Sequence, residues 1–233
     1  MRVVTFALIA GISLASMTAA GASYAYVGSG DKFAKVLLEF SDGAIYAFGV
    51  SFSDANTTGI GLMDLIESGT TLTTVRVNDP YFGTYIDGIS YEGHSNSGYG
   101  GGAMWWHYWG KDPSADWALS WVGASSRIAT NGCADGWIYG LDDAPRLPGD
   151  ATGDVSVDDA DFGAIARNWM QSGRTWADGD FTGDGVVNGD DFSALARFWG
   201  FGQAPSSSAS IPEPATIVLL AGGSLLWLRR NVG

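Results

Sequence analysis

Hydrophobic and polar residues alternate over much of the N-terminal half of the chain, with the period of β-strands. Residues 32–40 (KFAKVLLEF) and 44–52 (AIYAFGVSF) predict a hairpin, because the Ser-Asp-Gly segment at 41–43 is typical of a tight turn. Residues 59–68 predict a helix with one apolar face, made by Leu62, Leu65 and Ile66. Further strands are predicted at residues 71–77, 104–110, 118–123 and 135–141. This order indicates a β-rich α+β domain, which we place at residues 23–144.

An acidic loop followed by an apolar helix occurs twice in the C-terminal part of the chain. Residues 150–169 read DATGDVSVDDADFGAIARNW, and residues 180–199 read DFTGDGVVNGDDFSALARFW. Oxygen-bearing side chains stand at places 1, 3, 5, 9 and 12 of both loops, and place 7 offers a backbone carbonyl, which is the ligand spacing of a calcium-binding EF-hand loop. The predicted calcium ligands are Asp150, Thr152, Asp154, Ser156, Asp158 and Asp161 in the first loop and Asp180, Thr182, Asp184, Val186, Asn188 and Asp191 in the second.

Each loop is followed by apolar residues at helical spacing. They are Phe162, Ile165, Ala166 and Trp169 in the first copy and Phe192, Leu195, Ala196 and Trp199 in the second. Because neither helix can bury such a stripe alone, we expect the two to pack against each other as a small all-α unit. We expect the aromatic residues to be core, and Trp169 and Trp199 to have no part in binding calcium.

In residues 149–200 a loop followed by a helix occurs twice, and no helix is predicted before either loop. This arrangement resembles the dockerin module. The resemblance implies calcium-dependent folding and docking to a cohesin-like protein on a scaffold, often in the service of polysaccharide degradation.

Place 6 of the loop needs a left-handed backbone, which Gly185 adopts readily and the β-branched Val155 does not. We therefore expect the first site to have a distorted loop or a weaker affinity. The two residues before the last ligand are Asp159-Ala160 in the first loop and Gly189-Asp190 in the second. These pairs differ from each other and from the pair of hydroxyl residues that is common in dockerins. The sequence therefore supports calcium binding more than cohesin binding.

The two ends of the chain predict processing. Residues 1–22 combine a basic start, a short apolar run and the small residues Ala20-Gly21-Ala22, which indicates a signal peptide cut by signal peptidase. A linker rich in small residues is predicted at 201–211. Residues 215–228 are apolar but reach only about 21 Å as a helix, against about 30 Å of hydrocarbon, and two arginines follow. We expect this short helix to insert in the membrane transiently, with its basic end on the cytoplasmic side.

Pro212-Glu213-Pro214, the apolar run and the basic end together resemble a PEP-CTERM sorting signal at residues 212–233. The resemblance implies recognition and cleavage by an exosortase, and delivery to the cell surface or extracellular matrix of a Gram-negative-type bacterium, often among exopolysaccharide. The alternative is a plain tail anchor with prolines as a spacer.

Composition narrows the classes of partner and of chemistry. Twelve basic residues against twenty-five acidic ones give a net charge of −13, which argues against nucleic acid and for a cation. Cys133 is the single cysteine, so no internal disulfide forms. Only His94 and His107 are histidines, and the chain has neither a zinc-protease nor a nucleophile-elbow motif, so we assign no catalytic residue.

The N-terminal domain resembles the transcobalamin-C-terminal-like β-grasp domain, through the predicted helix and the segments at 85–93 (YIDGISYEG), 105–110 (WWHYWG) and 135–139 (DGWIY). This resemblance implies a fold and not cobalamin binding. Six tryptophans lie between Trp105 and Trp137. They either fill the core of a small sheet or form an exposed platform for sugar rings.

The sequence as a whole favours an exported, surface-sorted, non-enzymatic protein. Its calcium-stabilised module would dock a partner or act as a rigid spacer, and its N-terminal domain would bind a ligand or have a structural role. The alternative is a small polysaccharide-active or carbohydrate-binding domain delivered by the dockerin-like module. Two carboxyl groups about 5 to 10 Å apart in an aromatic-lined cleft would favour an enzyme.

Overall fold

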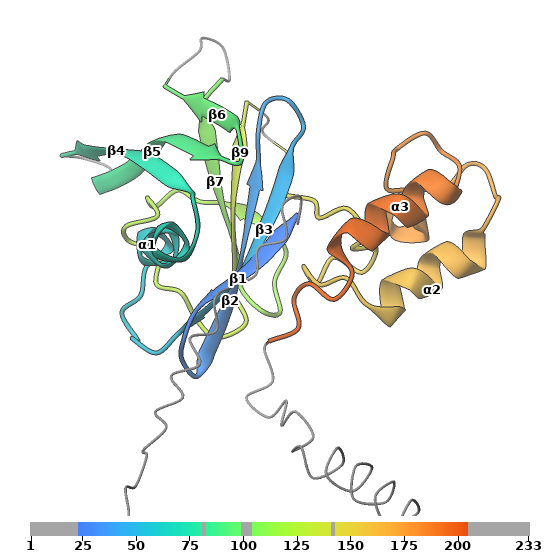
Figure 1. Cartoon of the computed structure of the whole chain (residues 1–233), viewed down its shortest axis with the longest axis horizontal. Helices are drawn as coiled ribbons and strands as arrows, with labels where there is room; N and C mark the ends of the chain where they lie inside the picture. The colour runs from blue at the N-terminus through green and yellow to red at the C-terminus, as the bar shows by residue number, and fades with distance from the viewer. Residues whose placement is uncertain (1–22, 81–82, 99–103, 141–142, 205–233) are drawn as a thin grey trace, which may run out of the picture. The chain divides into compact units, whose positions relative to one another are not determined.

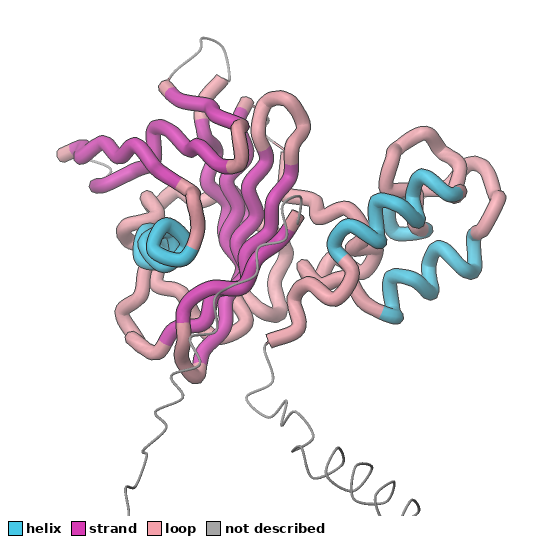
Figure 2. Tube along the Cα trace, viewed as in Figure 1, coloured by secondary structure: helices cyan, strands magenta, loops and turns pink. Residues whose placement is uncertain are grey.

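The computed structural model describes residues 23–80, 83–98, 104–140 and 143–204. Within these residues the protein is α+β and mostly strands, as the sequence predicts, and it has two β-sheets and three α-helices. Figures 1 and 2 show the strands gathered in the N-terminal part and two of the helices in residues 159–198. The predicted signal peptide, the sorting tail and most of the predicted linker lie outside the described residues.

The larger sheet has six strands in the order β1-β3-β2-β9-β7-β8. Its strands are β1 (Tyr24–Gly28), β2 (Lys32–Glu39), β3 (Ile45–Phe52), β7 (Trp106–Lys111), β8 (Ala118–Leu119) and β9 (Ala134–Tyr139). The predicted hairpin is confirmed, because β2 and β3 pair antiparallel over their whole length. The sequence pattern did not predict β1, which pairs parallel with β3, nor the parallel pairing of β2 with β9.

One face of this sheet is covered by α1 (Gly59–Gly69) and by a second sheet of three strands (Figure 1). The strands of the second sheet are β4 (Thr73–Asp79), β5 (Gly83–Tyr91) and β6 (His94–Ser97). Leu62 and Ile66 of the predicted helix face are fully buried there, and Leu65 packs at the edge of the same core. They share this core with Val36, Phe48 and Trp137 of the larger sheet.

The other face of the sheet is covered by the loop-helix repeat. This repeat consists of α2 (Asp159–Asn168), the 3-10 turn η1 (Trp176–Asp178) and α3 (Gly189–Phe198), so a helix follows each loop as predicted. Leu37 and Ala47 of the sheet share one buried cluster with Val157, Leu195 and Phe201 of the repeat. The repeat and the sheet are therefore packed together rather than joined only by a linker.

Hydrogen bonds reinforce this packing. The hydroxyl of Tyr24 donates to the carbonyl of Trp199 at 2.9 Å, and the hydroxyl of Tyr26 donates to that of Gly200 at 3.0 Å. The ammonium of Lys35 donates to the carbonyl of Asp154 and to Oγ of Ser156, at 2.8 and 2.9 Å. Polar groups on β1 and β2 thus hold both the end of α3 and the first acidic loop.

Three sequence predictions need correction here. The aromatic stripes Phe162, Trp169, Phe192 and Trp199 are not core, because each remains 43 to 47 % exposed. Ile165 and Leu195 lie instead in the buried cluster that also contains sheet residues. The two helices also contact each other, and the Phe162 and Phe192 rings meet edge to face at 6.4 Å. The linker does not begin at residue 201, because Phe201 is fully buried. Residues 118–123 do not form one strand, because pairing with β7 ends at Leu119 and a loop follows.

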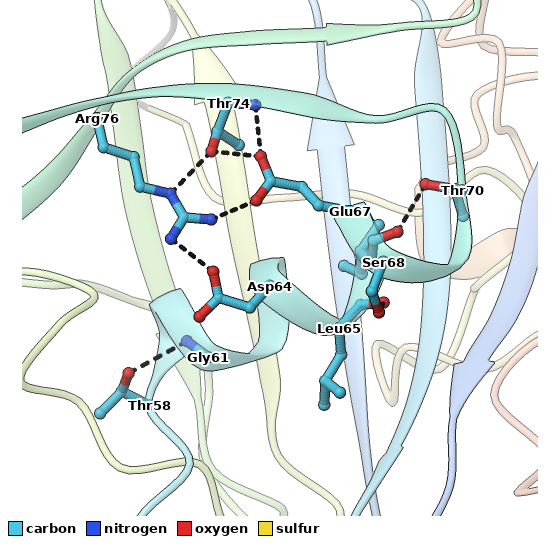
Figure 3. Close-up of polar contacts among 10 residues, drawn as sticks. Thr58, Gly61, Asp64, Leu65, Glu67, Ser68, Thr70, Thr74 and Arg76 are labelled. Atoms are coloured by element: carbon cyan, nitrogen blue, oxygen red, sulfur yellow. Dashed lines mark hydrogen bonds and ion pairs between the residues drawn. The ribbon is translucent and has the colours of Figure 1, made fainter.

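A polar network ties α1 to β4 (Figure 3). The carboxylate of Glu67 accepts hydrogen bonds from the backbone N–H and hydroxyl of Thr74, at 2.6 and 2.7 Å, and from the guanidinium of Arg76 at 2.6 Å. The same guanidinium donates to Asp64 at 2.6 Å, but the Asp64 side chain is more than half exposed. Glu67 is the centre of the network, and Asp64 lies at its rim.

We expect Glu67→Ala to lower the free energy of unfolding by about 1 to 3 kcal/mol, because it leaves Thr74 N–H and Arg76 without their shared acceptor. The matched control Asp64→Ala removes one exposed ion pair and should cost less than about 1 kcal/mol. Urea unfolding of both variants measures the two values. Equal losses would contradict the assignment of Glu67 as the centre of the network.

Candidate metal loops and an aromatic cleft

The two acidic loops have the same internal geometry. In the first loop, Oδ1 of Asp161 accepts from the backbone N–H groups of Ala151 and Thr152, at 2.9 and 3.1 Å, and Oδ2 accepts from Asp158 N–H at 2.9 Å. In the second loop, Asp191 accepts from Phe181, Thr182 and Asn188 at 2.8, 2.9 and 2.9 Å. The carboxylate at place 12 therefore closes each loop onto its own beginning and caps the helix that follows.

The carboxylate at place 1 organises the middle of each loop. Asp150 accepts from the N–H groups of Gly153 and Val155, and Asp180 accepts from the equivalent Gly183 and Gly185, all between 2.7 and 2.9 Å. The hydroxyl at place 3 donates to the carboxylate at place 1 in both loops. The structure thus brings together places 1, 3 and 12 of each predicted ligand set.

The remaining predicted side-chain ligands are turned toward neighbouring backbone. Asp154 accepts from Ser156 N–H and Asp184 from Val186 N–H, both at 2.8 Å. The residues at place 9, Asp158 and Asn188, accept from the N–H two residues further on and act as helix caps. Place 7 is contributed by Ser156 and Val186, whose predicted ligand is the backbone carbonyl.

Four carboxylates of the loops are buried, and burial makes their negative charge costly. Asp150, Asp161, Asp180 and Asp191 are at most 4 % exposed. Burial raises the pKa of Asp150 to about 6, and the negative charges of Asp154 and Asp161 add to the rise, although hydrogen bonds from the loop backbone oppose it. In each loop, a divalent cation bound to the carboxylate oxygens would remove the cost of burying their negative charge.

The donor set fits calcium by its chemistry. Carboxylate, hydroxyl, amide and carbonyl oxygens are the ligands that this hard cation takes, six to eight at a time. No group of three or more His, Cys, Asp or Glu side chains within the described part of the chain is placed to hold a metal ion. Carboxylates alone therefore do not form a metal site in either loop. To surround a calcium ion, each loop would also have to supply the hydroxyl at place 3, the carbonyl at place 7 and the residue at place 9.

Val155 at place 6 of the first loop adopts the left-handed backbone that its position requires, with φ of 62°, against 83° for Gly185 in the second loop. The expected distortion of the first loop is not seen, because its hydrogen bonds repeat those of the second. The Val155 side chain is 1 % exposed and packs in the cluster shared with the sheet. This packing offsets the backbone strain, and sequence reasoning missed it.

Sequence reasoning also missed Lys35, which lies on β2 beside the first loop. Burial lowers the pKa of Lys35, while the negative charges of Asp154 and Asp150 oppose that shift. The strand position of Lys35 was predicted, but its neighbour lies 119 residues further along the chain. No local pattern could have indicated that contact.

A cleft of about 460 Å³ lies in the N-terminal domain, between β7, β9 and the loop after β8. Its wall is mainly aromatic and includes Tyr85, Trp105, Trp106, Tyr108, Trp121 and Trp137. Trp106 and Trp137 are buried, whereas Trp105 is 39 % and Trp121 91 % exposed. The core role expected of the tryptophans is therefore confirmed for Trp106 and Trp137, whereas Trp105 and Trp121 are exposed.

An ion pair lies behind the wall of this cleft. The hydroxyl of Tyr108 donates to Oδ2 of Asp135 at 2.8 Å, and Nε of Arg127 lies 3.0 Å from Oδ1 of Asp135. The Asp135 side chain is fully buried. Burial raises the pKa of Asp135 to about 6, against the opposing effect of the Arg127 charge.

A scan against protein-family models gives no match for this chain, and a search of curated proteins gives no significant match. The two loops and the cleft are therefore the features of this chain that bear on its function. Among the described residues that line the cleft there is no Asp or Glu, so these residues offer no pair of carboxyl groups for glycoside hydrolysis.

We expect Asp135 to make the folded state less stable as the pH rises from about 4 to about 6. In this range the folded state retains a proton that the unfolded state has lost, because the pKa of Asp135 is about 6 in the fold and 3.8 ordinarily. The contribution is up to about 3 kcal/mol. Urea unfolding from pH 4 to 7 should show a shallower decline for Asp135→Asn than for the wild type.

Asp112→Asn is the control for this measurement, because Asp112 pairs with the same Arg127 but its side chain is 65 % exposed. A profile of Asp112→Asn that flattens as much as that of Asp135→Asn would assign the effect to the ion pairs of Arg127 and not to the buried carboxyl group. An Asp135→Asn profile parallel to that of the wild type would show that the carboxyl group titrates normally.

Proposed function

We propose that this is an exported, surface-sorted, non-enzymatic protein in which a dockerin-like module, stabilised by two calcium ions, is fixed against a β-grasp-like domain. The observation that carries the proposal is the pair of buried carboxylates built identically in both loops, Asp150 with Asp161 and Asp180 with Asp191. When bound, calcium would supply the positive charge that these carboxylates need inside the protein. The hydroxyl, carbonyl and place 9 oxygens would complete its shell.

The contacts with the sheet favour a spacer over a freely tethered docking module. Val155 and Phe201 are buried in the shared cluster, and Tyr24 and Tyr26 hold the end of α3. The exposed faces of Phe162, Phe192 and Trp199 still offer a surface to a cohesin-like partner. The module would then present that surface in a fixed orientation relative to the sheet.

Export and sorting rest on the sequence at the two ends. The basic and apolar start supports signal peptidase cleavage near residue 22, and the triplet Pro212-Glu213-Pro214 with its apolar and basic continuation supports exosortase cleavage and a place among exopolysaccharide. In the described residues, no helix has the length and apolar character needed to span a bilayer. The segment proposed to insert lies outside them.

We expect calcium to raise the thermal midpoint of the full chain, since a ligand that binds only the folded state stabilises it, by about 2.7 kcal/mol per site at a hundred times the dissociation constant. Because the module and the sheet share a core, both should unfold in one transition that shifts as a whole. Circular dichroism in calcium and in chelator measures the shift, and calorimetry should show two binding events. Equal midpoints in both buffers would rule out the calcium sites.

Asp191→Asn tests the second loop. An amide at place 12 presents donors to backbone N–H groups and removes one charge, so the stabilisation by calcium should fall by roughly half. The neighbouring Asp190→Asn removes an equal charge from an exposed side chain and should retain the full calcium effect. If both variants respond to calcium alike, the place 12 carboxylate is not a ligand.

Removal of residues 212–233 should release the protein into the medium of a host that has an exosortase. The double variant Pro212→Ala, Pro214→Ala is the control, because it retains the apolar run and both arginines and should remain in the inner membrane uncleaved. Immunoblots of the medium, outer-surface and inner-membrane fractions measure the distribution. Cleavage and release of the double variant would contradict the sorting role of the triplet.

A further inference from the structure

We propose that the aromatic cleft binds a neutral polysaccharide, with Trp121 stacked on the face of a pyranose ring. This inference does not depend on the calcium loops, which lie in a different part of the chain. It begins from Trp121, whose side chain is 91 % exposed. Trp121 is not alone, because Val122 beside it is 53 % exposed and Tyr85 and Trp105 of the same wall are each 39 % exposed. A contiguous exposed apolar patch of this kind marks an interaction site.

The loop that carries Trp121 is held on both sides by hydrogen bonds. Ser120 N–H donates to the carbonyl of Tyr108 at 2.8 Å, and Ser120 Oγ donates to the carbonyl of Val122 at 2.7 Å. Beyond the tryptophan, Ile60 N–H of α1 donates to the carbonyl of Ala124 at 3.1 Å. An exposed ring on an anchored loop is preorganised, so a ligand that stacks on it meets little cost in ordering.

The chemistry of the wall selects an uncharged ligand. Within the part of the chain that the structure describes, no Asp, Glu, Lys or Arg lines the cleft. The net charge of −13 also repels anionic polymers. The C–H face of a pyranose ring is apolar and weakly positive, which suits the negative face of an aromatic ring. Neutral polysaccharide therefore fits the wall better than acidic polysaccharide.

A proline-rich peptide is the other ligand that aromatic grooves commonly bind, and the cleft suits it less well. Such a peptide offers carbonyl acceptors and needs donors from the wall. Two of those donors are already committed, because Trp106 Nε1 donates to the carbonyl of Asn96 at 3.1 Å and the Tyr108 hydroxyl donates to Asp135. The observations therefore favour a saccharide.

Calorimetry of the full chain in calcium-containing buffer tests the inference. The probes are the neutral hexasaccharides of β-1,4-glucan, β-1,4-xylan and α-1,4-glucan, with hexagalacturonate and decaproline as the charged and peptide alternatives. We expect at least one neutral hexasaccharide to bind. Trp121→Ala should weaken that binding about tenfold or more through loss of the stacking surface.

Trp169→Ala is the matched control, because Trp169 is also an exposed tryptophan, at 47 %, but lies on the loop-helix repeat away from the cleft wall. Its affinity should stay within about twofold of the wild type. Three outcomes would each overturn the proposal. They are absence of binding by all three neutral probes, binding of decaproline or hexagalacturonate alone, and equal losses of affinity for Trp121→Ala and Trp169→Ala.

Discussion

The fold depends on a six-stranded sheet whose two faces are both apolar and must both be covered. Along β2, the buried side chains alternate between the faces: Val36 and Leu38 lie in the core with α1, and Leu37 lies in the cluster with the loop-helix repeat. All six residues of β9 are buried, which requires cover on both sides. The repeat is therefore part of the folded unit, because without it Leu37, Ala47 and Ala134 would face water.

This arrangement places charge next to apolar packing. Val155 and Val157 of the first loop lie in the shared cluster, and the carboxylate of Asp150 is buried beside them. The backbone hydrogen bonds that Asp150 accepts offset only part of the cost of burying its charge, which is why its pKa is raised. Lys35 brings one positive charge to the loop from the sheet. Calcium would supply the rest, so the ion would stabilise the cover of the sheet as well as the loop itself.

The sequence allowed the local parts of this structure to be predicted. The β2–β3 hairpin, α1 and the helix after each acidic loop all depend on short-range periodicity or turn residues, and each was found. The edge strand β1 and the parallel pairing of β2 with β9 depend on contacts across a long stretch of chain, and no period reports them.

The errors in the repeat have one physical origin. A stripe of Phe162 and Trp169 at helical spacing shows that a helix has an apolar face, but it does not show which neighbour that face meets. The only packing partner that the sequence indicated for each helix of the repeat was the other helix. The two helices do contact each other, and the Phe162 and Phe192 rings meet between them. Ile165 and Leu195 lie in the buried cluster that also contains sheet residues, and the larger aromatics remain at the surface. For the same reason, the sequence could identify the tryptophans of the cleft but could not separate Trp121 from the buried Trp137.

The loop-helix repeat and the cleft lie on opposite sides of the same strand, β9. On β9, Trp137 belongs to the core with α1 and to the cleft wall, whereas Ala134 belongs to the cluster with the repeat. No group of the cleft wall is also a predicted calcium ligand. Coupling between the two would therefore act through the stability of the shared sheet and not through a shared ligand. At calcium levels that leave the sheet folded, sugar affinity should be insensitive to calcium, since only the population of the folded state links the two sites.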